Sequence, residues 1–184
     1  MRYKSIIAIS FLMVSMHLKA QDVETKIKEI KTLFVTNKED SAEFVNKTVS
    51  FQCPDNPVGG DLVVQTKDNK IQTIYTNIGG DCAASLIDYF YNNDQLYFMF
   101  VRSGGIHEEE GKIIEYRSET RVYVNNGKIL RVTEKTASAP SEEIGAEFKK
   151  AKQEIVTDYD ESYLDLGNKL IKAYPTGIQK LYCE

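Results

Sequence analysis

Three similar segments in the middle of the chain constrain its fold more than any other feature. Each contains an apolar run, a turn of Asn or Asp with a polar partner, and a second apolar run, over residues 62–76, 86–101 and 120–134. Asn126-Gly127 in the third segment supplies the positive φ angles that a tight hairpin needs. Because strands joined by short turns run in opposite directions, three consecutive hairpins predict an antiparallel meander. A parallel sheet would need helical crossovers, and no helical pattern is visible between the first and third segments.

Helical patterns flank the hairpins on both sides. Apolar residues recur at helical spacing over 22–34 and predict an N-terminal helix. A second stripe steps by three or four residues after the hairpins, and a capping box at Asp158 and Glu161 would divide it into two helices. Its members are Ile144, Phe148, Ala151, Ile155, Tyr159, Tyr163, Leu166, Leu170 and Tyr174. We therefore expect an α+β fold: an antiparallel β-meander of about six to seven strands, an N-terminal helix, and a long C-terminal helix, continuous or broken, packed on the sheet.

One strand of this sheet is expected to be covered on both sides. Residues 96–101 are apolar at both alternating sets of positions, which is typical of a central strand buried on both faces. The hairpins are expected to be joined by loops at 79–80 and 103–111, where glycine pairs interrupt the apolar runs.

The first 20 residues have the three parts of a signal peptide. Arg2 and Lys4 precede an apolar run over 6–16, and Ala20 before Gln21 offers a small residue for cleavage. The run is shorter than the roughly 20 residues that cross a bilayer, although Lys19 leaves a retained anchor open as the alternative. We therefore predict a signal peptide over 1–20 and a single exported domain over 21–184, periplasmic or secreted, with no stable membrane anchor after cleavage.

The charge of the mature chain limits its partners. Three of the 23 basic residues lie in the leader, so 20 remain against 27 acidic residues, a net charge of −7. Nucleic-acid binding depends on clustered Lys and Arg, and an acidic chain argues against it. The same balance argues against binding to anionic membranes.

The cysteines predict one disulfide and one spare thiol, since an exported protein meets an oxidising compartment. A bond between Cys53 and Cys82 is favoured because the two bracket one predicted hairpin. Pairing of either with Cys183 is the alternative, and it would attach the C-terminal tail to the sheet. No CxxC motif indicates redox catalysis, so the bond is expected to be structural.

The hairpin strings FYNNDQLYFMF and VYVNNGKILRV resemble those of a group of small exported bacterial proteins. These proteins repeat an aromatic–Asn/Asp–Asn–Gly–Lys–apolar hairpin and end in a helix. The order of hairpins and helix in this chain agrees with that of the group over about residues 22–174, although the first repeat has Asp68-Asn69-Lys70 without Gly. The resemblance implies the layout and export, and it transfers no catalytic residue.

His107 is the one candidate for catalytic or metal chemistry. It is followed by Glu108, Glu109 and Glu110, and an imidazole beside Glu108 and Glu110 could hold a divalent metal or act as a general base. Against this, adjacent loop residues rarely converge on one ion, and no GxSxG motif presents a nucleophilic serine. A solvated acidic loop is the simpler interpretation, and no cofactor is predicted.

Tyrosines on the expected strands are the candidate ligand-binding residues: Tyr89, Tyr91, Tyr97 and Tyr123. Tyrosine gives rigid amphipathic contact area at recognition surfaces, although these rings could instead pack under the C-terminal helix. The sequence favours a non-catalytic exported module that binds an unidentified protein or small ligand through a tyrosine-rich sheet face or hairpin loops. A small hydrolase or metal-binding protein centred on His107 is the alternative.

The leader prediction is testable by mass spectrometry. When the full chain is expressed in a bacterium, the intact mass of the exported product should correspond to a chain that begins at Gln21. Replacing the small residue at the cleavage point, in Ala20→Arg, should leave the leader attached because signal peptidase requires a small side chain there. An exported native product that keeps all 184 residues would contradict the prediction.

Overall fold

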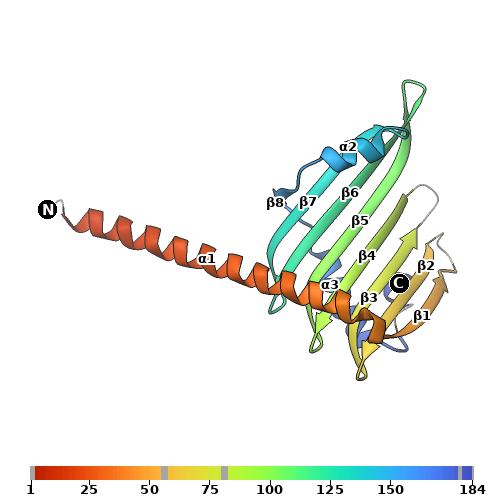
Figure 1. The fold of residues 1–184 in the computed structure, drawn as a ribbon, viewed down its shortest axis with the longest axis horizontal. Coiled ribbons are helices and arrows are strands. Elements are labelled where there is room, and N and C mark those ends of the chain that lie inside the picture. The colour runs from red at the N-terminus through yellow and green to blue at the C-terminus, as the bar shows by residue number, and fades with distance from the viewer. Residues whose placement is uncertain (1–2, 55–57, 80–82, 178–179, 184) are drawn as a thin grey trace.

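The computed structural model describes residues 3–54, 58–79, 83–177 and 180–183 (Figure 1). In chain order the elements are α1 (Tyr3–Asp40), a 3-10 turn (Ser41–Glu43), β1 (Val45–Gln52), β2 (Gly59–Lys67), β3 (Lys70–Gly79), β4 (Ala83–Asn92), β5 (Gln95–Glu109), β6 (Lys112–Asn125), β7 (Lys128–Pro140), α2 (Ile144–Lys150), β8 (Glu154–Val156), α3 (Ser162–Ala173) and α4 (Lys180–Cys183). The α+β class and the N-terminal helix are confirmed. The eight strands form one sheet in sequential order, every neighbouring pair antiparallel, which confirms the meander and exceeds the predicted six to seven strands.

Local turn chemistry accounts for the three predicted hairpins. Each turn has two central residues with positive φ, at Asp68-Asn69, Asn93-Asp94 and Asn126-Gly127. Two consecutive positive φ angles give the turn whose twist matches that of the flanking strands, and Asn, Asp and Gly tolerate this conformation.

A fourth tight turn replaces the loop that was predicted over 103–111. Only Glu110 and Gly111 form the turn, again with positive φ at both residues. The preceding residues continue β5 and pair with β6 as far as Glu109 and Lys112. The prediction is wrong because a glycine pair keeps its backbone hydrogen-bonding groups and need not end a strand, and backbone pairing to β6 continues through both Gly104 and Gly105.

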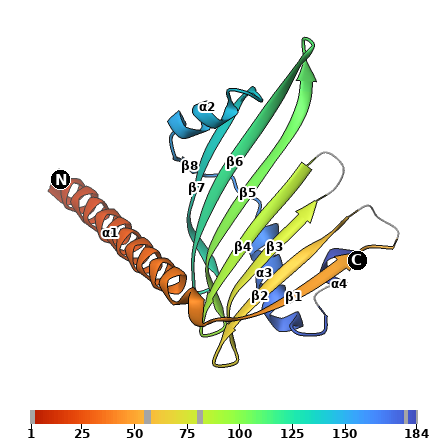
Figure 2. The same cartoon turned by 45° about the vertical axis from the view of Figure 1, so that its right-hand side comes forward.

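Helices from the two ends of the chain cover opposite faces of the sheet (Figure 2). On one face, α1 packs through Ile27 and Ile30 against Phe90, Phe98 and other rings. On the other face, Leu164 and Leu170 of α3 are buried in the larger core. Phe98 and Met99 of β5 belong to different clusters, which confirms that this strand is covered on both sides.

Helix α1 is longer than the predicted 22–34 and crosses one end of the sheet (Figure 1). Its Phe34 ring lies edge-on between Phe90 and Phe98, with centroids 5.0 and 5.1 Å away. Toward its C-terminal end, buried Asn37 accepts a hydrogen bond of 3.2 Å from the Thr73 hydroxyl on β3. Among the described residues, no helix combines the length and the apolar character that crossing a membrane requires.

The C-terminal helix is short and not long, which corrects the prediction. The apolar stripe is divided among α2, β8 and α3, because Glu154–Val156 pairs with β7 as an edge strand. This strand carries the chain around the sheet edge, so α2 lies on the face of α1 and α3 lies on the opposite face (Figure 2). One continuous helix could not pack on both faces.

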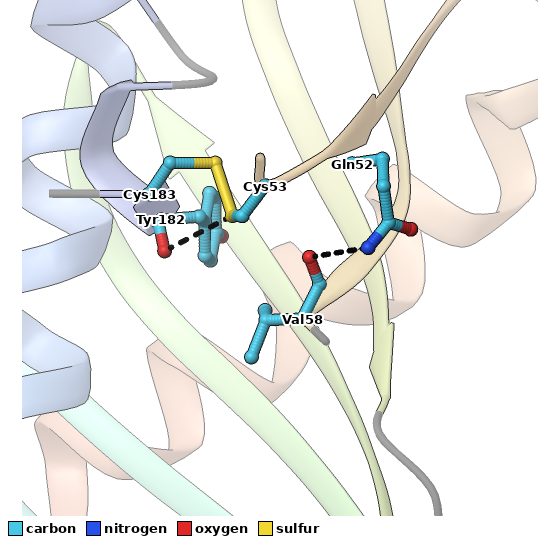
Figure 3. The surroundings of a disulfide bond; sticks show 5 residues. All are labelled: Gln52, Cys53, Val58, Tyr182 and Cys183. Carbon is cyan, nitrogen blue, oxygen red and sulfur yellow. Dashed lines mark hydrogen bonds between the residues drawn. A yellow bond between two sulfur atoms is a disulfide. The ribbon is translucent and has the colours of Figure 1, made fainter. Parts of the chain in front are cut away.

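The disulfide joins Cys53 to Cys183, with 5.3 Å between their Cα atoms, and does not join Cys53 to Cys82 (Figure 3). Cys53 and Cys82 do bracket the β2–β3 hairpin in the sequence, as the predicted pairing required, but Cys53 follows the edge strand β1. At that edge α4 packs on the sheet: the Tyr182 ring stacks on Phe51 at 5.1 Å. Cys82 lies outside the described residues. The bond therefore attaches the C-terminal tail to β1, the alternative that the sequence left open.

The packing of α3 gives a stability prediction with a built-in control. A Cβ atom at Gly167 would lie 2.6 Å from the Tyr89 ring and 2.8 Å from Leu96, whereas a Cβ at Gly145 of α2 meets nothing within 4 Å. In urea unfolding, Gly167→Ala should destabilise the protein by roughly 1–3 kcal/mol through overpacking. Gly145→Ala should be neutral or stabilising by up to about 1 kcal/mol, because alanine favours a helix. Equal stability of the two variants would contradict this packing of α3 on β4.

Candidate functional site

The four predicted binding tyrosines are buried and are divided between the two faces of the sheet. Tyr89 and Tyr91 lie in the core under α3, and Tyr97 and Tyr123 lie in the cluster under α1. None is more than 8 % exposed, and the Tyr91 hydroxyl donates a 2.8 Å hydrogen bond to the carbonyl of Gly167. Burial raises the pKa of Tyr89, Tyr91 and Tyr97 above its ordinary value. These rings therefore form packing surfaces, and they do not make one exposed tyrosine-rich face.

The region around His107 does not assemble a site among the described residues. His107 lies on β5 and not in a loop, exposed, with its Nε2 atom 3.9 Å from a Glu109 carboxylate oxygen. Glu108 projects to the opposite face because side chains alternate along a strand, and Glu110 lies in the turn. The described residues contain no group of three His, Cys, Asp or Glu side chains that could hold a metal ion. The hydrolase and metal-binding alternatives stay predictions without a supporting site.

A groove between α1 and the sheet is the best-formed candidate site, with a volume of about 370 Å³. This value lies within the roughly 300–1,000 Å³ typical of small-molecule pockets. We call it the α1 groove, and the residues that line it are Ile30, Lys31, Phe34 and Val35 from α1, Phe98 and Phe100 from β5, and Arg121 and Tyr123 from β6.

Aromatic rings form the floor of the α1 groove. Phe98 and Tyr123 are directly paired residues of β5 and β6, and their ring centroids are 5.3 Å apart. Phe34 of α1 packs against Phe98 from above at 5.1 Å. The groove forms because α1 crosses the strands: Phe100 lies beyond the helix and is partly exposed, and Val35 is an exposed side chain of the helix itself. Such a surface favours an apolar ligand.

Two cationic side chains border this apolar surface. Lys31 projects from α1, and its ammonium lies 5.8 Å from the centre of the Tyr123 ring. The Arg121 guanidinium lies 5.7 Å from the centre of the Phe100 ring. It donates a 2.8 Å hydrogen bond to the side-chain oxygen of Gln153 and has a carboxylate oxygen of Glu119 at 3.8 Å.

A partly buried ion pair lies beside the groove. Arg102 follows Phe100 by two residues on β5, and its guanidinium donates to both carboxylate oxygens of Asp88 at 3.0 Å. The Asp88 side chain is only 7 % exposed. Burial raises the pKa of Asp88, and the charges of Arg102 and Lys38 partly offset that effect. A second cavity of about 490 Å³ begins at Arg102 and reaches Phe148 of α2.

Comparison of the chain with protein-family models, curated proteins and solved structures found no match. The site is therefore defined by its own geometry.

Sequence reasoning identified one residue of the α1 groove, Tyr123, while Tyr97 lines a smaller cleft on the other side of α1. It missed Phe98, Phe100 and Arg121. The sequence pattern that pointed to these residues is the strand over 96–101, which is apolar on both faces. Such a strand requires another element packed on each face. Which face would be covered incompletely depends on the path of α1, and no local pattern contains that information.

The Asp88–Arg102 pair gives a pH-dependent prediction. In Arg102→Gln, Asp88 keeps a buried charge without its partner, so the protein should lose roughly 1–3 kcal/mol of unfolding free energy at pH 7. A raised pKa in the folded state means that the folded protein binds this proton more tightly, so the penalty should shrink as the pH falls toward 4 and Asp88 becomes protonated.

Arg117→Gln is the matched control for this measurement. It removes an exposed ion pair to Glu115, two residues away on the same strand, β6, and it should change stability by no more than about 1 kcal/mol at pH 7. Chemical denaturation at pH 7 and pH 4.5 measures both variants. An Arg102→Gln penalty that is the same at the two pH values would contradict the role assigned to Asp88.

Proposed function

We propose that the protein is an exported, non-catalytic binding protein that holds a small apolar ligand in the α1 groove. The observation that carries the proposal is the groove itself: about 370 Å³ of space with aromatic side chains from two strands on its floor and a helix over it. Burying the apolar surface of a ligand there would stabilise the complex by about 25 cal/mol for each Å² removed from water.

Export is part of the proposal. The leader over residues 1–20 supports it, and so does the Cys53–Cys183 bond, because such bonds persist mainly in oxidising compartments. The bond connects β1 with the C-terminal tail, on the face opposite the α1 groove. It therefore stabilises the sheet without occupying the space offered to a ligand.

A small ligand is favoured over a protein partner. The tyrosines that the sequence predicts as binding residues are buried, whereas the α1 groove is concave. Such a site suits a small molecule that enters the groove between helix and sheet.

Fluorescence of N-phenyl-1-naphthylamine, an uncharged apolar probe, tests the proposal. The purified native protein should increase the probe's emission with saturable binding. Val35→Asp places a hydrated carboxylate in the groove, and it should weaken binding at least about tenfold, because the probe must desolvate that charge.

Leu33→Asp is the control. Leu33 and Val35 are both exposed side chains of α1, at 39 % and 51 %, but only Val35 lines the groove. Leu33→Asp should therefore bind the probe with nearly native affinity, and both variants should unfold at similar temperatures. Absence of saturable binding by the native protein, or equal loss in the two variants, would refute the proposal.

A further inference from the structure

The charges at the edge of the α1 groove point to a specific ligand chemistry, and this inference rests on the proposed function. We infer that the ligand is a single-chain carboxylate, with its hydrocarbon chain in the α1 groove beside Phe100 and Val35 and its carboxylate at Arg121 and Lys31. The groove is apolar under the helix and cationic at its edge. A molecule with one apolar and one anionic end matches this distribution.

Lys31 and Arg121 are the cations that line the α1 groove, and both have charge left to offer. Arg102 is neutralised by Asp88 through two hydrogen bonds, and Arg131 is bound to Glu24. Lys31, in contrast, has no ion-pair partner within 4 Å among the described residues, and it lies over the ring of Tyr123.

Arg121 is only partly neutralised. Its nearer partner is the uncharged side chain of Gln153 at 2.8 Å, and the carboxylate of Glu119 is 3.8 Å away. A planar guanidinium presents several N–H donors, so it can keep the bond to Gln153 and still donate to a carboxylate. Such charge-assisted hydrogen bonds are roughly twice as strong as neutral ones.

The net charge at the edge of the α1 groove and the volume of the groove restrict the class of ligand further. Lys31 and Arg121 against Glu119 leave a net charge of one positive unit, which matches a carboxylate better than a dianionic phosphate. The volume of about 370 Å³ is near the lower end of the range for ligand pockets, so it suits one hydrocarbon chain and not a two-chain lipid.

Competition against N-phenyl-1-naphthylamine on the native protein tests the inference without any substitution. Dodecanoate and dodecanol have the same chain length and differ in the anionic group. At pH 8 and low salt, dodecanoate should displace the probe at roughly tenfold lower concentration than dodecanol. The advantage should decrease at high salt, because ions screen exposed charges.

The variants Arg121→Gln and Lys31→Gln test whether these two cations cause the preference for dodecanoate. Each should reduce the advantage of dodecanoate over dodecanol several-fold, while dodecanol displaces the probe as in the native protein. Lys128→Gln, at the first residue of β7 and not in the lining of the groove, is the matched control and should preserve the advantage. If Arg121→Gln fails to fold, Lys31→Gln decides alone, because Lys31 is exposed on α1 and forms no ion pair with the part of the chain that the structure describes.

The results that would contradict this inference differ from the result that would contradict the proposed function. Probe binding that dodecanol and dodecanoate displace equally would overturn the carboxylate assignment and leave the apolar groove intact. Dodecyl phosphate that outcompetes dodecanoate would also overturn it, in favour of a phosphate ester. If the native protein does not bind the probe at all, the groove is not a binding site and both proposals fail.

Discussion

The arrangement of this protein depends on a sheet whose central strands are apolar on both faces. Phe90 and Phe98 face one side, while Tyr89 and Met99 face the other, and all four are buried. An uncovered face would expose such side chains to water, which would cost about 25 cal/mol for each Å² of apolar surface exposed. The chain meets this requirement with helices from its two ends. Helix α1 covers one face before the strands begin, and α3 covers the other after they end (Figure 2).

Helices α3 and α1 differ in how closely they pack on the sheet, and the candidate site results from that difference. Under α3 the packing leaves no space: Gly167 lies so close to Tyr89 that a methyl group would collide, and its carbonyl accepts a hydrogen bond from Tyr91. Helix α1 crosses the strands on the other face and covers only the part of the sheet beneath it. Where the strands continue past the helix, Phe100 and Arg121 remain open and form the α1 groove. The face with the poorer cover is therefore the one available to a ligand.

On this face, some charged side chains are neutralised by ion pairs within the fold, and others are not fully neutralised. Asp88 is buried and is held by Arg102, so this pair contributes to the fold and has little capacity for a ligand. Arg121 and Lys31 lie next to apolar rings and are incompletely neutralised. The juxtaposition of free positive charge and aromatic surface is the basis for assigning an anionic amphiphile to the groove.

The sequence by itself determined three of the hairpins, because their two-residue turns with positive φ depend mainly on the Asn, Asp and Gly residues of the turn. It also determined the presence of the N-terminal helix and the double-sided burial of β5, which follow from local periodicity. Only the tertiary structure decided that β5 continues through Gly104-Gly105, that residues 154–156 join the sheet edge, and that Cys53 meets Cys183. These features depend on contacts between segments far apart in the chain. The α1 groove belongs to the same class, since it exists only where a helix from one end crosses strands from the middle.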